Sequence, residues 1–246
     1  MDNNKDQDLF LEKMQAPIIV TGCARSGTSM IAGAIELCGA FGGQVASKST
    51  ETRELHEHTF ICESIVKPYL LRSGIDPSCQ YPLPNIHWLN IPKDWKRRVQ
   101  KAIIHDGYEN GQWFYKSTKA CLMWPVWNYA FPNAKWIIVR RRTGDIIDSC
   151  LKTDFMKAFK QNNAQQAVRA TNEFDGWRWW VHQHEKRFVE MIMGGVNCKV
   201  VWPHRMVYGD YQEMMETIDW LGLKWNSDVL SFIDPKLWKS RMRGGV

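Results

Sequence analysis

The segment from Ile18 to Ala32 restricts the fold of this chain more than any other stretch of the sequence. It begins with the β-branched run Ile18-Ile19-Val20, typical of a buried strand, and passes through small and glycine residues to Thr28 and Ser29, where a helix is expected to open. The first turn of such a helix has backbone N–H groups without intrahelical partners and carries the positive end of the helix dipole. The sequence therefore predicts a strand, a phosphate-sized loop and a helix N-terminus that binds an anionic group.

The loop satisfies only part of the nucleotide-binding pattern G-x-x-x-x-G-K-[ST]. Gly22, Gly27 and Ser29 fit the pattern, whereas Thr28 stands where the pattern has lysine. Because that lysine normally bridges the β- and γ-phosphates of a nucleoside triphosphate, its replacement indicates a different donor, and the basic residue Arg25 lies inside the loop instead. The alternative is a strand-turn-helix junction whose glycines serve only the turn.

Length and composition favour one large domain. The chain has 246 residues, of which 44% are apolar, enough for a substantial core. We expect a polar tail at residues 1–15 and a single domain at residues 16–246. The sequence has no run of about 18 apolar residues and its first residues do not follow the signal-peptide pattern, so we expect a cytoplasmic protein that does not enter the membrane.

The net charge and the cysteine content limit the classes of ligand and of metal or disulfide chemistry that this chain supports. The net charge of +6 favours anionic ligands, but the basic residues are spread along the chain, which disfavours nucleic acid as the partner. Seven scattered cysteines without a C-x-x-C pair favour reduced thiols over disulfides or a zinc site. Most of the thirteen tryptophans are expected in the core or in a pocket wall.

A second strand-to-helix junction carries positive charge. The expected strand Lys135-Trp136-Ile137-Ile138-Val139 runs into Arg140-Arg141-Arg142, and the helix that follows has Ser149 in its second turn. Between the two junctions, a strand at residues 112–115 ends in Lys116, and basic residues just past the end of a parallel strand lie where ligands bind. The alternative for Lys116 is a solvated lysine. Two phosphate sites in one domain indicate a donor with two separated anionic groups.

The remaining segments complete an alternating pattern of strands and helices. A proline-rich segment at residues 75–95 is expected to be irregular and to form a lid or part of an acceptor wall. A helix through residues 60–70 should be kinked or split at Pro68. Further helices are expected at residues 94–106, 121–131, 163–193 and 213–221, and further strands at residues 199–202 and 205–208. The pattern predicts a single α/β domain with a three-layer, doubly wound, mainly parallel sheet.

Taken together, the motifs resemble those of the sulfotransferases, which use 3′-phosphoadenosine 5′-phosphosulfate (PAPS) as sulfuryl donor. Residues 22–29 are similar to the family's 5′-phosphosulfate loop, R-S-G-T-[ST]. The family's 3′-phosphate motif has an arginine at a strand end, an aspartate at +4 and a serine at +8, a spacing that Arg141, Asp145 and Ser149 satisfy. Lys116 is similar to the lysine of W-x-x-K-D-P-R, although Ser117-Thr118-Lys119 replaces D-P-R. Residues 207–210 and 220–223 are similar to the late Y-E-D-L and W-L-G-L elements.

The resemblance implies sulfuryl transfer from PAPS, with 3′-phosphoadenosine 5′-phosphate (PAP) as product and without a metal. The acceptor would be a small-molecule, sugar or peptide hydroxyl, or an amine. Arg25 and the backbone N–H groups of residues 26–29 would hold the 5′-phosphate and stabilise the leaving charge. Lys116 would neutralise the transferring sulfuryl oxygens, and Arg141 with Ser149 would anchor the 3′-phosphate. The full set of expected donor-binding residues is Gly22, Arg25, Ser26, Gly27, Thr28, Ser29, Arg141 and Ser149.

Three residues are candidates for the general base that the acceptor requires. The context Leu55-His56-Glu57-His58 is similar to the family's G-[YF]-[FW]-E-N, which makes Glu57 the first choice. Glu51 is second, because Glu51-Thr52-Arg53 resembles the E-T-R of protein-tyrosine sulfotransferases, and His56 is third. His56 and His58 are two positions apart and point away from each other on a helix, which disfavours a metal site and leaves a solvated helix start as the alternative.

Two other functions are compatible with the sequence. One is a nucleotide or small-molecule kinase on the same P-loop scaffold, which would need magnesium-dependent turnover of ATP. The other is a non-catalytic protein that binds a nucleotide or another anion.

Overall fold

The computed structural model describes residues 10–43 and 56–238 and is built around a four-stranded parallel sheet. The strands are β1 (Ile18–Gly22), β2 (Phe114–Lys116), β3 (Lys135–Val139) and β4 (Cys198–Val201), in the order β2-β1-β3-β4. Ile18 of β1 lies opposite Phe114 of β2 and Lys135 of β3, so β1 is paired on both sides. β2, the next strand in the chain, pairs with one edge of β1, and β3 pairs with its other edge. This order confirms the expected doubly wound sheet, and its switch point lies between β1 and β3.

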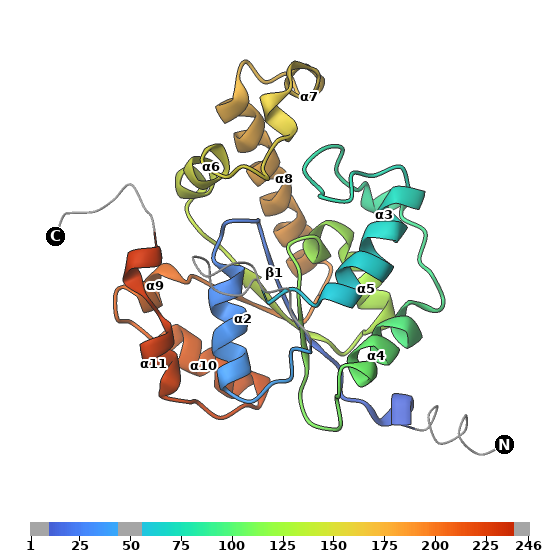
Figure 1. Cartoon of the computed structure of the whole chain (residues 1–246), viewed down its shortest axis with the longest axis vertical. Coiled ribbons are helices and arrows are strands. Elements are labelled where there is room, and N and C mark those ends of the chain that lie inside the picture. The colour runs from blue at the N-terminus through green and yellow to red at the C-terminus, as the bar shows by residue number, and fades with distance from the viewer. Residues whose placement is uncertain (1–9, 44–55, 239–246) are drawn as a thin grey trace.

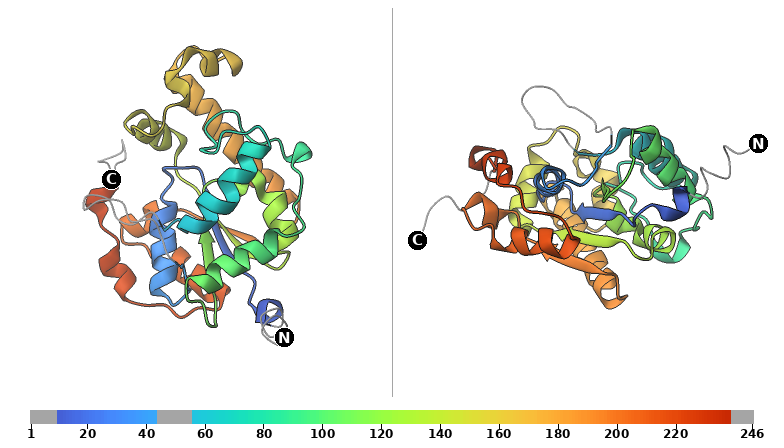
Figure 2. Two further views of the ribbon diagram at one scale, coloured as in Figure 1. Left: turned by 45° about the vertical axis from the view of Figure 1, so that its right-hand side comes forward. Right: turned by 90° about the horizontal axis from the view of Figure 1, so that it is seen from below.

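Helices cover both faces of the sheet, as the alternation of side chains along each strand requires. Ile18 and Val20 face a cluster with α2, α10 and α11, whereas Ile19 faces a cluster with α3, α4, α5 and the C-terminal part of α8. Figure 1 shows these two groups of helices on opposite sides of β1, and Figure 2 turns the same arrangement. The helices are α2 (Thr28–Leu37), α3 (Lys67–Arg72), α4 (Trp95–His105), α5 (Trp124–Ala130), α6 (Thr143–Leu151), α7 (Asn162–Ala167), α8 (Glu173–Met193), α9 (His204–Val207), α10 (Gln212–Leu221) and α11 (Asp228–Phe232).

Pro68 shapes the wall beside the sheet in the way that the sequence predicts. The chain forms a π-helix over Ile61–Val66 and continues as α3, with Pro68 in the first turn of α3. A proline has no N–H to donate to the carbonyl four residues earlier, which is that of Ser64. Nη2 of Arg98 in α4 donates to this carbonyl instead, at 3.1 Å. The junction is thereby held against α4 without an unpaired carbonyl.

Two expectations about the C-terminal half are wrong. The stretch at residues 163–193 is two helices, because Asn172 caps α8 by accepting a hydrogen bond from the Asp175 amide at 3.0 Å and so starts a new helix. The segment at residues 205–208 was expected to be a strand but belongs to α9 and its C-terminal end.

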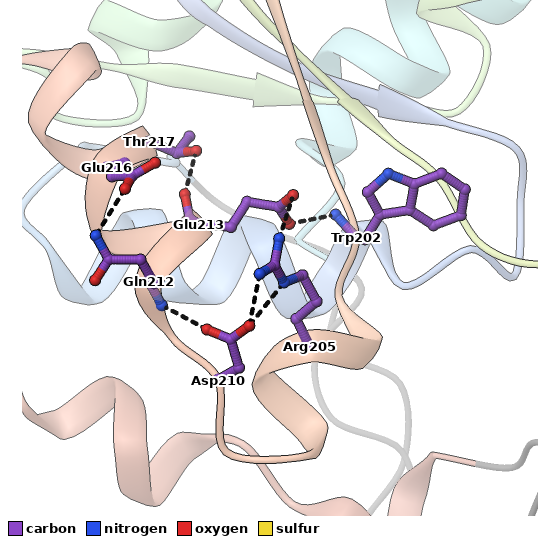
Figure 3. Close-up of polar contacts among 7 residues, drawn as sticks. All are labelled: Trp202, Arg205, Asp210, Gln212, Glu213, Glu216 and Thr217. Atoms are coloured by element: carbon purple, nitrogen blue, oxygen red, sulfur yellow. Dashed lines mark hydrogen bonds and ion pairs between the residues drawn. The ribbon is translucent and has the colours of Figure 1, made fainter.

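Ion pairs explain why residues 205–208 are helical. Figure 3 shows that Arg205 is held by Asp210, with Nε at 2.8 Å from Oδ2, while Glu213 accepts from the Trp202 amide at 2.7 Å. Both acidic residues lie beyond α9, so these contacts fold the segment back toward the end of β4. The strand-like composition of the segment is overridden by tertiary contacts.

The described residues were compared with the requirements of a membrane-spanning helix and of reactive cysteines. Within residues 10–43 and 56–238, no helix combines the length and the apolar character that crossing a bilayer requires. The seven cysteines are free thiols, six of them buried. Burial raises the pKa of Cys79, Cys121 and Cys150 to about 12, so these thiols are protonated and unreactive at neutral pH.

Candidate active site

The loop between β1 and α2 depends on glycine for its shape. Gly27 has φ +99°, in the left-handed region, and a Cβ at this position would lie 3.0 Å from the Trp238 ring and 3.1 Å from Cγ of Pro203. A Cβ on Gly22 would lie 2.5 Å from the carbonyl oxygen of Val139 in β3. Arg25 adopts φ +72°, a conformation that costs about 1–2 kcal/mol for a residue with a side chain. The glycine frame of the motif therefore allows close packing, and the backbone at Arg25 is strained.

The N-terminus of α2 presents polar groups suited to an anion. No side chain caps the helix, and within the described residues the amides of Gly27 and Thr28 have no acceptor. The hydroxyl of Ser26 is buried and also has no partner in that part of the chain. The Ser26 amide, which was expected to bind the donor, instead donates to the Cys23 carbonyl at 3.1 Å. Backbone binding of an anion thus falls to residues after Ser26.

The two phosphate motifs meet at the switch point of the sheet. Nε of Arg25 donates to Oγ of Ser149 in α6 at 2.9 Å, and Nη1 of Arg141 donates to the carbonyl oxygen of Arg25 at 2.9 Å. These partners are 124 and 116 residues apart in sequence. The contacts arise because the loops that follow β1 and β3 leave adjacent strands in the same direction.

Arg141 is held on several sides. Asp145 lies 4.0 Å from its Nε, and the Trp238 ring covers the guanidinium plane with its centroid 4.0 Å from Cζ. The Arg141 side chain is only 7% exposed. An aromatic ring on one face of a guanidinium leaves the N–H edges as the groups that can bind an anion. Trp238 was not among the residues expected in the site from sequence.

Lys116 and Glu57 form an ion pair in the same cavity. Nζ of Lys116 lies 3.2 Å from Oε1 of Glu57, and the two side chains are 4% and 22% exposed. Burial alone would raise the pKa of the Glu57 carboxyl, but the ammonium groups of Lys116 and Lys119 outweigh it and hold the pKa below its ordinary value. Burial lowers the pKa of Lys116, and the Glu57 carboxylate offsets part of this effect. Glu57 is therefore ionised at neutral pH.

The two histidines near Glu57 have separate structural partners. Nδ1 of His56 lies 3.0 Å from a carboxylate oxygen of Glu36 in α2, and the edge of its ring packs against Phe232. Nε2 of His58 lies 3.0 Å from Asp106, and both of these side chains are almost fully buried. The two histidines contact carboxylates on different segments, but residues 56–58 precede the helix instead of lying on it, so the expected helical spacing is not what separates them. Within the part of the chain that the structure describes, no group of three or more His, Cys, Asp or Glu side chains is placed to hold a metal ion. Glu51 lies outside the described residues.

A cavity of about 500 Å³ connects these groups. Of the residues expected in the site, Arg25, Gly27, Thr28, Ser29, Arg141, Lys116, Glu57 and His56 line it, whereas Gly22, Ser26 and Ser149 do not. The lining also includes side chains that sequence reasoning did not assign to the site: Cys62, Glu63, Lys67, Cys79, Gln80, Lys119, Leu122, Phe155, Met156, Trp180 and His184. Of these, Lys119 had a sequence signal, because it falls in the segment aligned with K-D-P-R.

The comparisons with known proteins concern the fold. No protein-family model matches the sequence, and no curated protein matches it. Among solved structures, the chain is similar to sulfotransferase STF9 from Mycobacterium avium, with 14% identity, a TM-score of 0.54, and coverage of 92% of this chain and 69% of that one. It is also similar to sulfotransferase STF1 from Mycobacterium tuberculosis, with 13% identity, a TM-score of 0.52, and coverage of 94% and 73%. The chain therefore has the sulfotransferase fold, as the motifs predicted.

Proposed function

We propose that this protein transfers a sulfuryl group from PAPS to a hydroxyl or amine of an acceptor. The observation that supports this most strongly is the meeting of the two phosphate motifs through Arg25, Ser149 and Arg141. Arg25 and Arg141, one from each motif, line the same cavity, and a donor with phosphates at both the 5′ and the 3′ positions would bring an anionic group to each of them. The fold of the two mycobacterial sulfotransferases agrees with this assignment.

The charges and polar groups on the donor side fit the nucleotide. Arg25, Arg141 and Lys116 line the cavity, and three cations suit a donor that carries several negative charges. The amides of Gly27 and Thr28, which have no partner in the described chain and belong to residues that line the cavity, supply hydrogen-bond donors at the start of α2. Thr28 occupies the position where a nucleoside-triphosphate site has lysine, which is consistent with a donor that has no γ-phosphate.

Glu57 and Lys116 divide the chemistry at the transferring group. Glu57 is ionised, so its carboxylate accepts the proton that the acceptor hydroxyl or amine loses as it attacks the sulfur. Lys116 lies beside Glu57 and places positive charge next to the sulfuryl oxygens. Arg25 and the first turn of α2 stabilise the negative charge that develops on the 5′-phosphate as the bond to sulfur breaks.

Calorimetric titration tests this function without knowledge of the acceptor. We expect PAP to bind in the absence of magnesium with a micromolar dissociation constant, on the order of −8 kcal/mol. ATP is expected to bind more weakly, with or without magnesium. Failure to bind PAP together with magnesium-dependent binding and turnover of ATP would overturn the proposal in favour of a kinase.

A further inference from the structure

Lys119 is a buried cation in the lining of the cavity. It follows β2, at the start of the 3₁₀ turn Ala120–Met123, and its residue is 8% exposed. Its side chain lines the cavity together with Cys62, Glu63 and Cys79. In residues 10–43 and 56–238, its ammonium group forms no hydrogen bond and no ion pair within 4.0 Å.

The other charges on this side of the cavity are paired with one another. Lys116 contacts Glu57 at 3.2 Å, and Lys67 contacts Glu63 at 2.5 Å. Three lysines therefore face two glutamates here, and Lys119 is the one that makes no ion pair with the residues that the structure describes. A buried ammonium group without a direct partner costs free energy, and an anion that contacts it recovers part of that cost.

Of the charges that act on Lys119, the largest is that of Glu57, the group proposed to meet the acceptor. Burial acts to lower the pKa of Lys119, but nearby negative charge, first of all that of the Glu57 carboxylate, outweighs this effect and raises the pKa, so Lys119 is protonated. None of these neighbours belongs to the phosphate loop or to the strand end at Arg141. Lys119 is thus separate from the cations assigned to the two phosphates of the donor.

Two polar side chains of this lining are already engaged with the protein. Both polar atoms of the Gln80 amide are used, because Oε1 accepts from the amides of Lys157 and Ala158 and Nε2 donates to the Phe155 carbonyl. His184 shares its Nδ1 proton with the Trp180 carbonyl at 2.9 Å, and burial lowers its pKa to about 4, so the ring is neutral. Among the lining lysines that the structure describes, Lys119 is the buried one without an ion pair.

We infer that the acceptor carries an anionic group, a carboxylate, sulfate or phosphate, near the hydroxyl or amine that is sulfated, and that Lys119 binds this group. The inference rests on the proposed function and adds the charge of the substrate to it. The apolar side chains of Leu122, Met156 and Trp180 contact the carbon frame to which the two groups are attached.

Matched pairs of small acceptors test this inference on the full-length protein saturated with PAP. One pair is 4-hydroxyphenylacetate and 4-methylphenol, and the other is methyl β-glucuronide and methyl β-glucoside. Calorimetry is expected to show that the anionic member of at least one pair binds on the order of 10-fold more tightly than the neutral member. Lys119→Ala should remove the preference and Lys119→Arg should keep it. Lys101→Ala, an exposed site on α4 with the same change in charge, should also keep it.

Three results would overturn the inference. The first is that the wild-type protein binds the anionic and neutral members of both pairs equally well, and the second is that Lys119→Ala keeps the wild-type preference for the anionic member. The third is that Lys119→Ala loses as much affinity for PAP as it loses for the anionic acceptor. The last result would assign Lys119 to the donor. Thermal melting of both Lys119 variants checks that they are folded. Failure of PAP to bind contradicts the proposed function instead, and the same pairs titrated against the unliganded protein still report on Lys119.

Discussion

Replacing Arg141 by alanine removes the group that we assign to the 3′-phosphate. The Arg141 side chain is almost fully buried, stacks on Trp238, donates to the Arg25 carbonyl and lines the cavity, so its position is fixed beside the expected phosphate. A hydrogen bond to a charged group contributes about 1.5–3 kcal/mol, which corresponds to roughly a 10- to 150-fold loss of PAP affinity. Affinity for adenosine 5′-phosphate, which has no 3′-phosphate, should change much less.

The assay is a calorimetric titration of both nucleotides into the wild-type protein and two variants. The ratio of the PAP affinity to the adenosine 5′-phosphate affinity reports the contribution of the 3′-phosphate alone. A substitution that weakens the binding of both nucleotides equally leaves this ratio unchanged. Arg140→Ala is the matched control, because Arg140 lies on the same strand end but stacks on Trp202 and pairs with Glu185 instead of lining the cavity. The reasoning is refuted if Arg141→Ala retains the wild-type ratio or if Arg140→Ala loses it to the same extent.

Further predictions concern the base, the loop and a buried histidine. Glu57→Gln should retain PAP binding and lose about 10²–10⁴-fold in the rate of transfer, and full activity in this variant would reject Glu57 as the base. In the wild-type protein the transfer rate should fall on acidification only below the ordinary glutamate pKa of 4.5, because the pKa of Glu57 is lowered. Gly27→Ala should weaken PAP binding and lower the melting temperature more than Gly39→Ala does. Both glycines have positive φ, but only the new methyl group at Gly27 meets other side chains. Equal effects of the two substitutions in melting and titration would contradict this prediction. Burial lowers the pKa of His184 in the folded protein to about 4, against an ordinary value of 6.5. The neutral ring therefore contributes about 3 kcal/mol to the free energy of unfolding above pH 6.5, and this contribution is lost as the pH falls toward 4. Denaturant unfolding should show a flatter acid limb for His184→Gln, and an unchanged slope would count against it.

The elements that carry the phosphate motifs could be predicted because their signals are local. β1 and β3 are short β-branched runs, and each is followed by a helix whose first turn is marked in the sequence. The spacing from Arg141 to Asp145 and Ser149 also singled out one arginine of three. The structure gives a physical reason, since Arg140 and Arg142 are more exposed at their side chains than Arg141.

Most of the remaining cavity lining could not be predicted, because it is assembled from distant segments. Nothing in the local sequence indicates that Trp238 covers Arg141, and the position of Lys119 in the K-D-P-R segment does not indicate that it lines a cavity with Cys79 and Glu63. The expected strand at residues 205–208 failed for a similar reason. Its composition favours a strand, but the ion pair of Arg205 with Asp210 depends on a turn that local propensity does not specify.

Sulfuryl transfer itself is the central claim, and one measurement tests it most directly. Wild-type protein, Glu57→Gln and Arg141→Ala are incubated with PAPS labelled in its sulfuryl group and with a metabolite and protein extract, without added metal. The account predicts a labelled product with the wild-type protein that is reduced at least 100-fold with Glu57→Gln and clearly reduced with Arg141→Ala at limiting PAPS. Equal labelling by the wild-type protein and Glu57→Gln, in preparations that bind PAP equally well, would contradict the assigned chemistry. The absence of any labelled product despite PAP binding would identify a nucleotide-binding protein instead of an enzyme.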